Sequence, residues 1–232
     1  VVSPGVPRDS APLKKARARG LPVLSELELA ARCINSPLIA VTGTNGKTTT
    51  VSLAGEMMKA GLGAERVFVG GNIGTPLLEL ALAGREAAAA VVEVSSFQLE
   101  FAETFHPRVA ALLNVSADHL DRYRDFEDYA ATKSLIFKNQ VPEDFAVLNL
   151  DDPVVERMRS GVKARLLSVS LNRPAETLGM WTEGGEIIYK SEAGAASFLE
   201  TRELKLAGRH NLYNVMTAGL AALALGLEAE LV

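Results

Sequence analysis

The chain has 232 residues, 48% of them hydrophobic, and a formal net charge of −4. This length and apolar content can bury a sizeable core, which excludes a disordered chain, and the negative charge excludes a nucleic-acid partner held by a broadly basic surface. The longest apolar stretch, around 215–227, is too short to span a bilayer, so no membrane partner is expected. Cys33 is the single cysteine, so no intrachain disulfide can form, and we expect a cytoplasmic protein.

The first 35 residues differ in composition from the rest of the chain. They hold four prolines and a basic run at 14–19, and the chain starts at Val1 and not at Met. The opening residues, 1–5, indicate a strand that runs into a turn. We therefore expect residues 1–35 to finish a domain that begins upstream, and residues 36–232 to form a second, nearly complete domain.

Beyond residue 37, short β-rich runs alternate with longer Ala- and Leu-rich segments. This alternation is typical of a wound α/β fold, in which a mostly parallel sheet carries helices on both faces. It predicts strands at 38–42, 66–69, 89–94, 109–114, 146–149 and 166–169, and helices at 48–60, 76–83, 129–139 and 211–225. Residues 179–206 change to short alternating segments at 180–182, 186–190 and 196–200, with a Gly184-Gly185 hairpin signal, which predicts a small antiparallel β appendage.

A glycine-rich loop joins the first strand of this pattern to its first helix. The loop consists of Gly43, Thr44, Asn45, Gly46, Lys47, Thr48 and Thr49. In such a loop the backbone amides and the helix N-terminus face phosphate oxygens, the lysine contacts the terminal phosphates, and the following hydroxyl is a ligand of Mg2+. The general motif has a glycine where this chain has Val41, so the loop is a variant. We predict that it binds ATP or a similar nucleotide together with Mg2+.

Polar side chains follow other predicted strands. Asn72 lies in a glycine-rich turn after the second strand, Glu93 stands at the end of the third, and His119 follows the fourth within a charged cluster. Because wound sheets bind ligands at the carboxyl ends of their strands, Glu93 is a candidate Mg2+ ligand. Each residue has a structural alternative. Glu93 could be a solvated or helix-capping carboxylate, Asn72 a turn asparagine, and His119 a structural or exposed histidine. Ser95 and Ser96 have no base placed near them, so we expect them to cap the next helix.

Several segments together resemble one family. They are 42–48, 70–74, 93–100, 114–123 and 208–214, with the string Ser-Ser-Phe-Gln-Leu-Glu at 95–100. The chain resembles the Mur ligase family over nearly its whole length, and this string is most diagnostic of the member that adds D-glutamate to UDP-N-acetylmuramoyl-L-alanine. The resemblance implies amide-bond formation through an acyl phosphate in peptidoglycan precursor synthesis, with ATP and Mg2+. The alternatives are a sister Mur ligase, a folylpolyglutamate-type ligase, and a nucleotide-binding module without catalysis.

The resemblance also implies roles for individual residues. It assigns Lys47, His119 and Lys133 to catalysis, Thr48, Glu93, His119 and Lys133 to the metal, Asn211 and Asn214 to the adenine, and Ser3, Gly5, Asn72, Gln98 and His119 to the acceptor substrate. Taken by itself, Lys133 looks like an ordinary surface charge on a helix. The family carries a carbamylated lysine at this position, and the carbamate oxygens suit Mg2+.

The family has three domains, and the resemblance divides this chain accordingly. It implies that residues 1–35 end the N-terminal UDP-binding domain and that residues 36–232 are almost all of the central ATP-binding domain. It also implies that the C-terminal domain, which brings the amino acid in the family, lies outside this sequence. We therefore expect this chain alone to be inactive, and the full-length protein to act as a monomer on small-molecule substrates.

Overall fold

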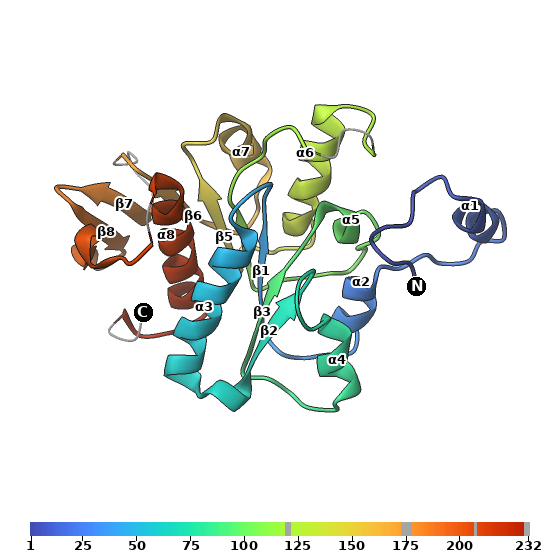
Figure 1. Cartoon of the computed structure of the whole chain (residues 1–232), viewed down its shortest axis with the longest axis horizontal. Helices are drawn as coiled ribbons and strands as arrows, with labels where there is room; N and C mark the ends of the chain where they lie inside the picture. Colours follow the sequence, from blue (N-terminus) through green and yellow to red (C-terminus); the bar gives the residue numbers. More distant parts are fainter. Residues whose placement is uncertain (119–121, 173–177, 207, 230–232) are drawn as a thin grey trace.

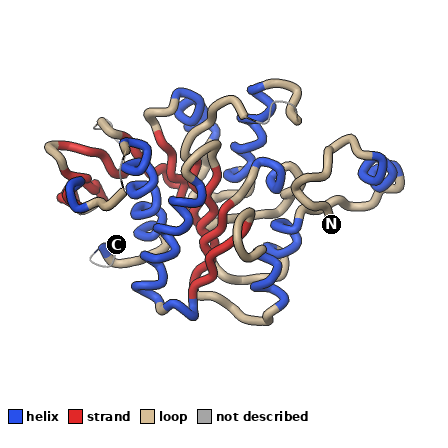
Figure 2. The backbone as a smooth tube through the Cα atoms, viewed as in Figure 1, coloured by secondary structure: helices blue, strands red, loops and turns tan. Residues whose placement is uncertain are grey.

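One sheet runs through the centre of the molecule (Figure 1; strands in red in Figure 2). The computed structural model describes residues 1–118, 122–172, 178–206 and 208–229. Its strands lie in the order β2-β3-β1-β4-β5-β6-β7-β8-β9. Neighbours from β2 to β7 are parallel, whereas β7, β8 and β9 pair antiparallel. In chain order the strands are β1 (Leu38–Thr42), β2 (Val67–Gly71), β3 (Ala89–Glu93), β4 (Val109–Leu112), β5 (Phe145–Asn149), β6 (Arg165–Ser170), β7 (Gly179–Glu183), β8 (Glu186–Ser191) and β9 (Gly194–Glu200).

Helices cover both faces of the parallel part of the sheet. Leu38 and Ala40 of β1 belong to one hydrophobic core, and Ile39 and Val41 to the other, because successive side chains of a strand point to opposite faces. Both faces are therefore apolar, and all of β1 is buried. One face is covered by α3 (Lys47–Leu62) and α8 (Arg209–Ala224), and the other by α2 (Glu26–Ala31), α4 (Leu77–Leu82), α5 (Ser96–Leu99), α6 (Phe126–Ser134) and α7 (Pro153–Met158). Short 3-10 helices complete the connections: η1 (Ala64–Arg66), η2 (Leu135–Phe137), η3 (Arg159–Gly161) and η4 (Thr201–Glu203).

The predicted α/β fold is confirmed, with shifted ends at several elements. The helix predicted at 129–139 begins earlier, at Phe126, because the Asp125 side chain accepts a hydrogen bond from the Asp128 amide and caps it; its last predicted residues form η2 and a turn. The predicted antiparallel strands are present as well. They continue the main sheet, since β7 pairs in parallel with β6. Gly184 and Gly185 both have positive φ in the turn between β7 and β8, as the hairpin signal requires.

Residues 1–24, which we call the arm, project from the sheet domain and carry α1 (Ala11–Ala18) (Figure 1). A small cluster of Val2, Leu13 and Phe101 is buried where the arm meets the domain. At the same junction Glu28 is fully buried, and its carboxylate accepts hydrogen bonds from the backbone amides of residues 103–105. The arm is therefore held by apolar contacts, next to a segment that the Glu28 carboxylate of α2 fixes in place.

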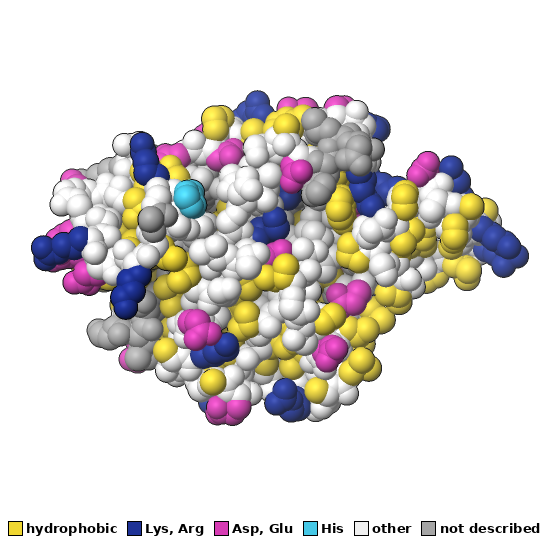
Figure 3. Space-filling model, in the orientation of Figure 1, with side chains coloured by type: hydrophobic (Ala, Val, Ile, Leu, Met, Phe, Trp, Pro, Cys, Tyr) yellow, Lys and Arg dark blue, Asp and Glu magenta, His cyan; other side chains and the backbone are white. Residues whose placement is uncertain are grey.

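The surface mixes both signs of charge. On the face drawn in Figure 3, acidic and basic side chains are interspersed, and hydrophobic side chains gather over the arm and its junction. Within the described ranges, no helix combines the length and the apolar character needed to cross a membrane.

Candidate nucleotide and metal site

The glycine-rich loop lies between the end of β1 and the first turn of α3. Gly46, immediately before α3, has a φ of 87°, a left-handed conformation that favours glycine. A Cβ atom on Gly46 would also lie 2.4 Å from the Asn214 side-chain oxygen of α8. The loop conformation therefore favours glycine at this position, and a larger residue would also displace the Asn214 side chain. The N-terminus of α3, a 16-residue helix with no acidic residue in its first turn, adds partial positive charge to the loop.

Two lysine amines converge on this loop. Lys47 Nζ donates to the carbonyl oxygens of Gly43 at 3.0 Å and of Thr44 at 2.9 Å. Lys133 Nζ, from α6 on the opposite face of the sheet, donates to the same Gly43 carbonyl at 2.9 Å. The two amines therefore meet at one carbonyl oxygen of the loop.

Glu93 ends β3 next to the loop and is 2% exposed. Its Oε2 accepts a hydrogen bond from Thr48 Oγ1 at 2.8 Å, and its Oε1 accepts one from Asn72 Nδ2 at 3.0 Å. These three side chains meet because β3 lies between β2 and β1, and all three strands end at the same edge. Hydroxyl and carboxylate oxygens are ligands that Mg2+ prefers, so Thr48 and Glu93 fit a Mg2+ ion beside the phosphate loop.

Lys133 is buried, although a lysine on a helix usually indicates an ordinary surface charge. It is 2% exposed, and its Nζ lies 4.7 Å from the centroid of the Tyr129 ring. Burial and then the positive charge of Lys47 lower the pKa of the Lys133 amine to about 7, against the opposing effect of Asp118. An amine with this pKa is largely neutral at physiological pH, and a neutral amine is a nucleophile.

A cavity of about 120 Å³ opens beside these residues. It is lined by Lys47, Asn72, Ser95, Ser96, Phe97, Asp118, Tyr129 and Lys133. The structure thus brings together Lys47, Asn72 and Lys133 at one cavity. Glu93 is hydrogen-bonded to Asn72 and to Thr48. His119 lies outside the described residues.

The two asparagines of α8 support the loop from the other side. Asn214 is buried and donates through Nδ2 to Asn211 Oδ1 at 3.0 Å, while its Oδ1 accepts from Thr50 Oγ1 at 3.3 Å. Thr50 belongs to the first turns of α3, so these side chains connect α8 to the phosphate loop. These bonds give Asn214 a structural role, and the contact of both asparagines with an adenine ring stays a prediction.

The acceptor residues predicted from the resemblance are not all at the cavity. Ser3 and Gly5 lie at the start of the arm and are not among the described residues that line it. Gln98 is buried, and its Oε1 accepts hydrogen bonds from the amide and the hydroxyl of Ser95, while Ser95 Oγ accepts from the Gln98 amide. This reciprocal pair is a capping box, which confirms the predicted capping role of Ser95 at α5.

One residue that shapes the site had no predicted role. Asn114 Oδ1 accepts from the Asn45 amide at 2.9 Å, and its Nδ2 donates to the Asn45 carbonyl at 3.0 Å. The Asn114 carbonyl also accepts from the Thr44 amide at 3.0 Å. Asn114 therefore holds the tip of the phosphate loop. The available signal was a polar residue at the carboxyl end of a buried strand.

Comparisons with known proteins identify the family. Residues 41–222 match the model of the Mur ligase middle domain. A protein of Geobacter sp. described as UDP-N-acetylmuramoylalanine--D-glutamate ligase is 52% identical over 99% of this chain and 50% of its own length, and one of the same description from Geotalea daltonii is 49% identical over 98% and 49%. The chain thus spans about half the length of these curated relatives. A pseudomurein peptide ligase type C from Methanothermus fervidus shares the fold, with a TM-score of 0.65 at 20% identity over 99% of this chain and 55% of its own. The motif, the strand-end carboxylate and the family match lead to one conclusion: the chain belongs to the Mur ligase family.

Proposed function

We propose that the full-length protein is an ATP-dependent ligase that joins D-glutamate to UDP-N-acetylmuramoyl-L-alanine. The observation that carries this proposal is the convergence of Lys47 and Lys133 on the Gly43 carbonyl, beside the Thr48–Glu93 hydrogen bond. The choice of D-glutamate and of the acceptor rests on the description of the relatives that are about half identical over nearly all of this chain.

The proposed reaction has two steps. A carboxylate oxygen of the acceptor attacks the γ-phosphorus of ATP, the bond to ADP breaks, and an acyl phosphate forms. The D-glutamate amine then attacks the acyl carbon, phosphate leaves, the amide bond forms, and the amine loses a proton. Lys47 and the loop amides stabilise the negative charge on the transferring group, mainly by position and electrostatics. A bound Mg2+ would neutralise phosphate charge, with Thr48 and Glu93 as its protein ligands.

We propose a modified lysine at position 133. The neutral Lys133 amine attacks the carbon of CO2 and loses one proton, which produces a carbamate. Burial favours this reaction because it lowers the pKa of Lys133 to about 7. The product replaces an amine next to Lys47 with an anionic group whose oxygen atoms suit Mg2+. His119 belongs to the same proposal as a further ligand of the metal and of the acceptor.

The remaining assignments complete the proposal. Residues 1–35 would belong to the UDP-binding domain and residues 36–232 to the central domain. Ser3, Gly5, Asn72 and Gln98 would hold the acceptor, and Asn211 and Asn214 would face the adenine. The single cysteine of the chain supports a cytoplasmic location.

Nucleotide binding tests the first half of this proposal. Calorimetry with ATP and Mg2+ is expected to show binding to this chain, and the Lys47→Ala variant is expected to lose it. Lys59→Ala, near the other end of α3, is the matched control, because Lys59 is paired with Glu56 on the helix surface. Equal binding by the Lys47→Ala variant would contradict the assignment of the phosphate loop.

Phosphate release by the full-length protein tests the second half. Release is expected only when UDP-N-acetylmuramoyl-L-alanine and D-glutamate are both present. If another amino acid or another acceptor is required instead, the protein is a sister ligase, and the substrate assignment is wrong while the nucleotide site stands.

A further inference from the structure

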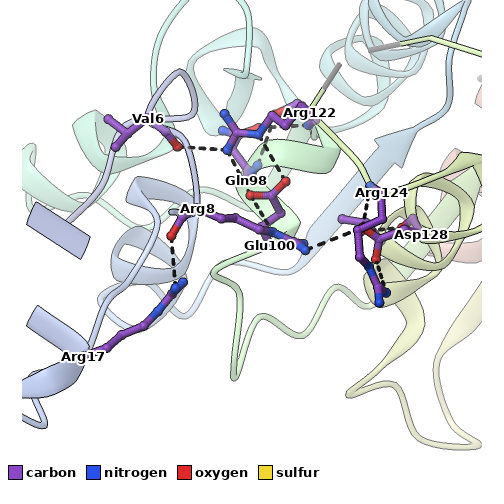
Figure 4. Close-up of polar contacts among 10 residues, drawn as sticks. Val6, Arg8, Arg17, Gln98, Glu100, Arg122, Arg124 and Asp128 are labelled. Atoms are coloured by element: carbon purple, nitrogen blue, oxygen red, sulfur yellow. Dashed lines mark hydrogen bonds and ion pairs between the residues drawn. The ribbon is translucent and has the colours of Figure 1, made fainter. Parts of the chain in front are cut away.

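A buried carboxylate, Glu100, lies one residue beyond α5 and outside the cavity. Its side chain is 0% exposed. Figure 4 shows two arginines that converge on it. Arg8 Nε lies 3.0 Å from Glu100 Oε2, and Arg122 donates to the carboxylate through Nη2 at 2.9 Å and Nε at 3.3 Å. Because a buried charge is costly unless it is fully paired, this arrangement specifies one geometry of the groups around it.

The two arginines come from different parts of the molecule. Arg8 belongs to the arm, and its Nη1 also lies 4.0 Å from Asp128 of α6. Arg122 Nη2 donates to the Val6 carbonyl of the arm at 3.0 Å. We refer to Arg8, Glu100 and Arg122 as the arginine clamp. The clamp connects the arm to α5, and through Asp128 it also connects the arm to α6.

A row of aromatic rings continues from the clamp towards the nucleotide site. The Arg122 guanidinium carbon lies 4.2 Å from the Phe97 ring centroid. Phe97 stacks on Tyr123, with centroids 6.1 Å apart, and Tyr123 packs against Tyr129 at 5.1 Å. The clamp is thus in continuous contact with Tyr129 through packed rings.

Tyr129 connects this row of rings to Lys133 and to the phosphate loop. Its ring lies below Lys133 Nζ at 4.7 Å, and its hydroxyl is 3.2 Å from Thr44 Oγ1 of the phosphate loop. Phe97 and Tyr129 both line the cavity. A shift of the rings would therefore move the surface on which Lys133 and the phosphate loop are placed.

We propose that Glu100 is a positioning residue for the transfer reaction, which it serves by holding Arg8 and Arg122 so that the docked arm fixes the aromatic rings beneath Lys133. Glu100 acts through other residues and does not line the cavity. The arm also carries Ser3 and Gly5, so the clamp would make the geometry of the phosphate site depend on the part of the protein proposed to hold the acceptor. The kinetic part of this inference rests on the proposed function, whereas the clamp itself rests on the contacts above.

A purely structural ion pair predicts a different outcome. Its loss would lower the stability of the fold but would leave turnover by the folded molecules unchanged. A positioning role predicts lower kcat in molecules that remain folded, because misplacing reacting groups by a fraction of an ångström to 1 Å reduces the rate of transfer. The separation of kcat from stability and from the KM for ATP therefore distinguishes the two roles.

The test uses the full-length protein with Glu100→Gln, Arg8→Met and the double variant. For Glu100→Gln we expect kcat to fall about 10-fold or more, with the KM for ATP changed less than about 3-fold. Glu100→Asp keeps the charge and is expected to recover part of kcat. The double variant is expected to be no slower than Glu100→Gln alone, because both changes break one clamp. Glu56→Gln, on the exposed surface of α3, is the matched control and is expected to keep wild-type kcat.

Wild-type kcat in folded Glu100→Gln protein would overturn the proposal, as would fully additive losses in the double variant. If Glu100→Gln does not fold, Arg8→Met tests the proposal instead. The Arg8 side chain is 38% exposed, so its replacement should destabilise the fold less. Reduced kcat at unchanged melting temperature then supports the clamp, and unchanged kcat overturns it.

Failure of the proposed function has a separate signature, namely no phosphate release by the wild type with D-glutamate and the acceptor. In that case hydrogen exchange decides. Faster exchange of the α6 amides and of residues 43–48 in Glu100→Gln supports the clamp, and exchange equal to that of the wild type overturns it.

Discussion

Lys133 offers a direct test of the electrostatics of the site. Burial and the positive charge of Lys47 lower the pKa of its amine to about 7, whereas an ordinary lysine has a pKa of about 10.4. At pH 8 about nine-tenths of Lys133 amines would be neutral, against about 0.4% of ordinary lysines, a ratio of about 200. Lys133 should therefore react as a nucleophile at pH values where ordinary lysines are protonated.

Trace acetylation with an anhydride measures this pKa. The protein is labelled at a series of pH values together with free Nα-acetyl-lysine amide as internal standard, and the peptide that contains Lys133 is quantified by mass spectrometry. Labelling at each pH is divided by the plateau at high pH, so that limited access to a buried amine does not affect the midpoint. We expect a midpoint near 7 for Lys133, well below that of the standard.

Two variants separate the causes of the shift. Lys47→Met removes the nearby positive charge and should raise the midpoint of Lys133, though not to the value of the standard, since burial remains. Lys59→Met, on the same helix, should leave it unchanged. A wild-type midpoint equal to that of the standard would refute the reasoning, because it would mean that the amine is solvated.

The same shift makes stability depend on pH. Because the folded pKa lies below the unfolded value of 10.5, the unfolded chain binds more protons between about pH 7 and 10.5. Stability contributed by this group therefore rises with pH across that window, by at most about 1.4 kcal/mol per pH unit. Lys133→Met should remove this slope, as measured by urea denaturation at several pH values. An unchanged slope would contradict the shift.

Three further predictions concern stability and metal binding. Glu28→Ala should destabilise the fold by about 3–5 kcal/mol in urea denaturation, because the buried groups that bond to the carboxylate would lose their partner. Desolvation raises the pKa of Glu28, but its hydrogen bonds lower the pKa overall. The stabilising effect of Glu28 should therefore be lost as the pH falls below about 4.5. Gly71→Ala should cost about 1–3 kcal/mol in the same assay and weaken Mg2+-dependent nucleotide binding, since φ is 106° and the added Cβ would lie 2.4 Å from the Glu93 carbonyl oxygen; Gly74→Ala, with φ 64° but open space around it, should cost less and leave binding unchanged. Thr48→Val should abolish the Mg2+ dependence of ATP binding in calorimetry while Thr48→Ser retains it, and retained dependence in the valine variant would exclude this hydroxyl as a ligand.

Local patterns were sufficient to predict most of the fold. Every residue of β1 is apolar except Thr42, and the loop that follows has glycines where the backbone must turn, so a strand, a loop and a helix could be predicted in order. The start of α6 was missed because its first turn holds Glu127 and Asp128, which interrupt the apolar period. Capping by Asp125 determines that boundary, and capping depends on side-chain geometry.

Part of the candidate site could be predicted from contiguous sequence, and part of it is placed only by packing. The phosphate loop is contiguous in sequence, and the residues at 95–100 and 208–214 could be recognised by resemblance. The burial of Lys133 could not be predicted from its helix, because Lys133 stands among polar neighbours, Thr132 and Ser134, and the burial comes from packing against the loop after β1 and against Tyr129. The support that Asn114 gives to Asn45 was missed for the same reason, since the two residues are distant in sequence.

The sequence by itself determined the α/β class, the phosphate loop and the family resemblance, because hydrophobic period, turn residues and contiguous motifs depend on neighbours along the chain. Tertiary structure alone decided that Glu93 meets both Thr48 and Asn72, that β7 to β9 extend the main sheet, and that Arg8 and Arg122 close on Glu100. The physical reason is that these contacts arise from strand order and from the desolvation of paired charges, and both quantities exist only when segments far apart in the sequence have packed together.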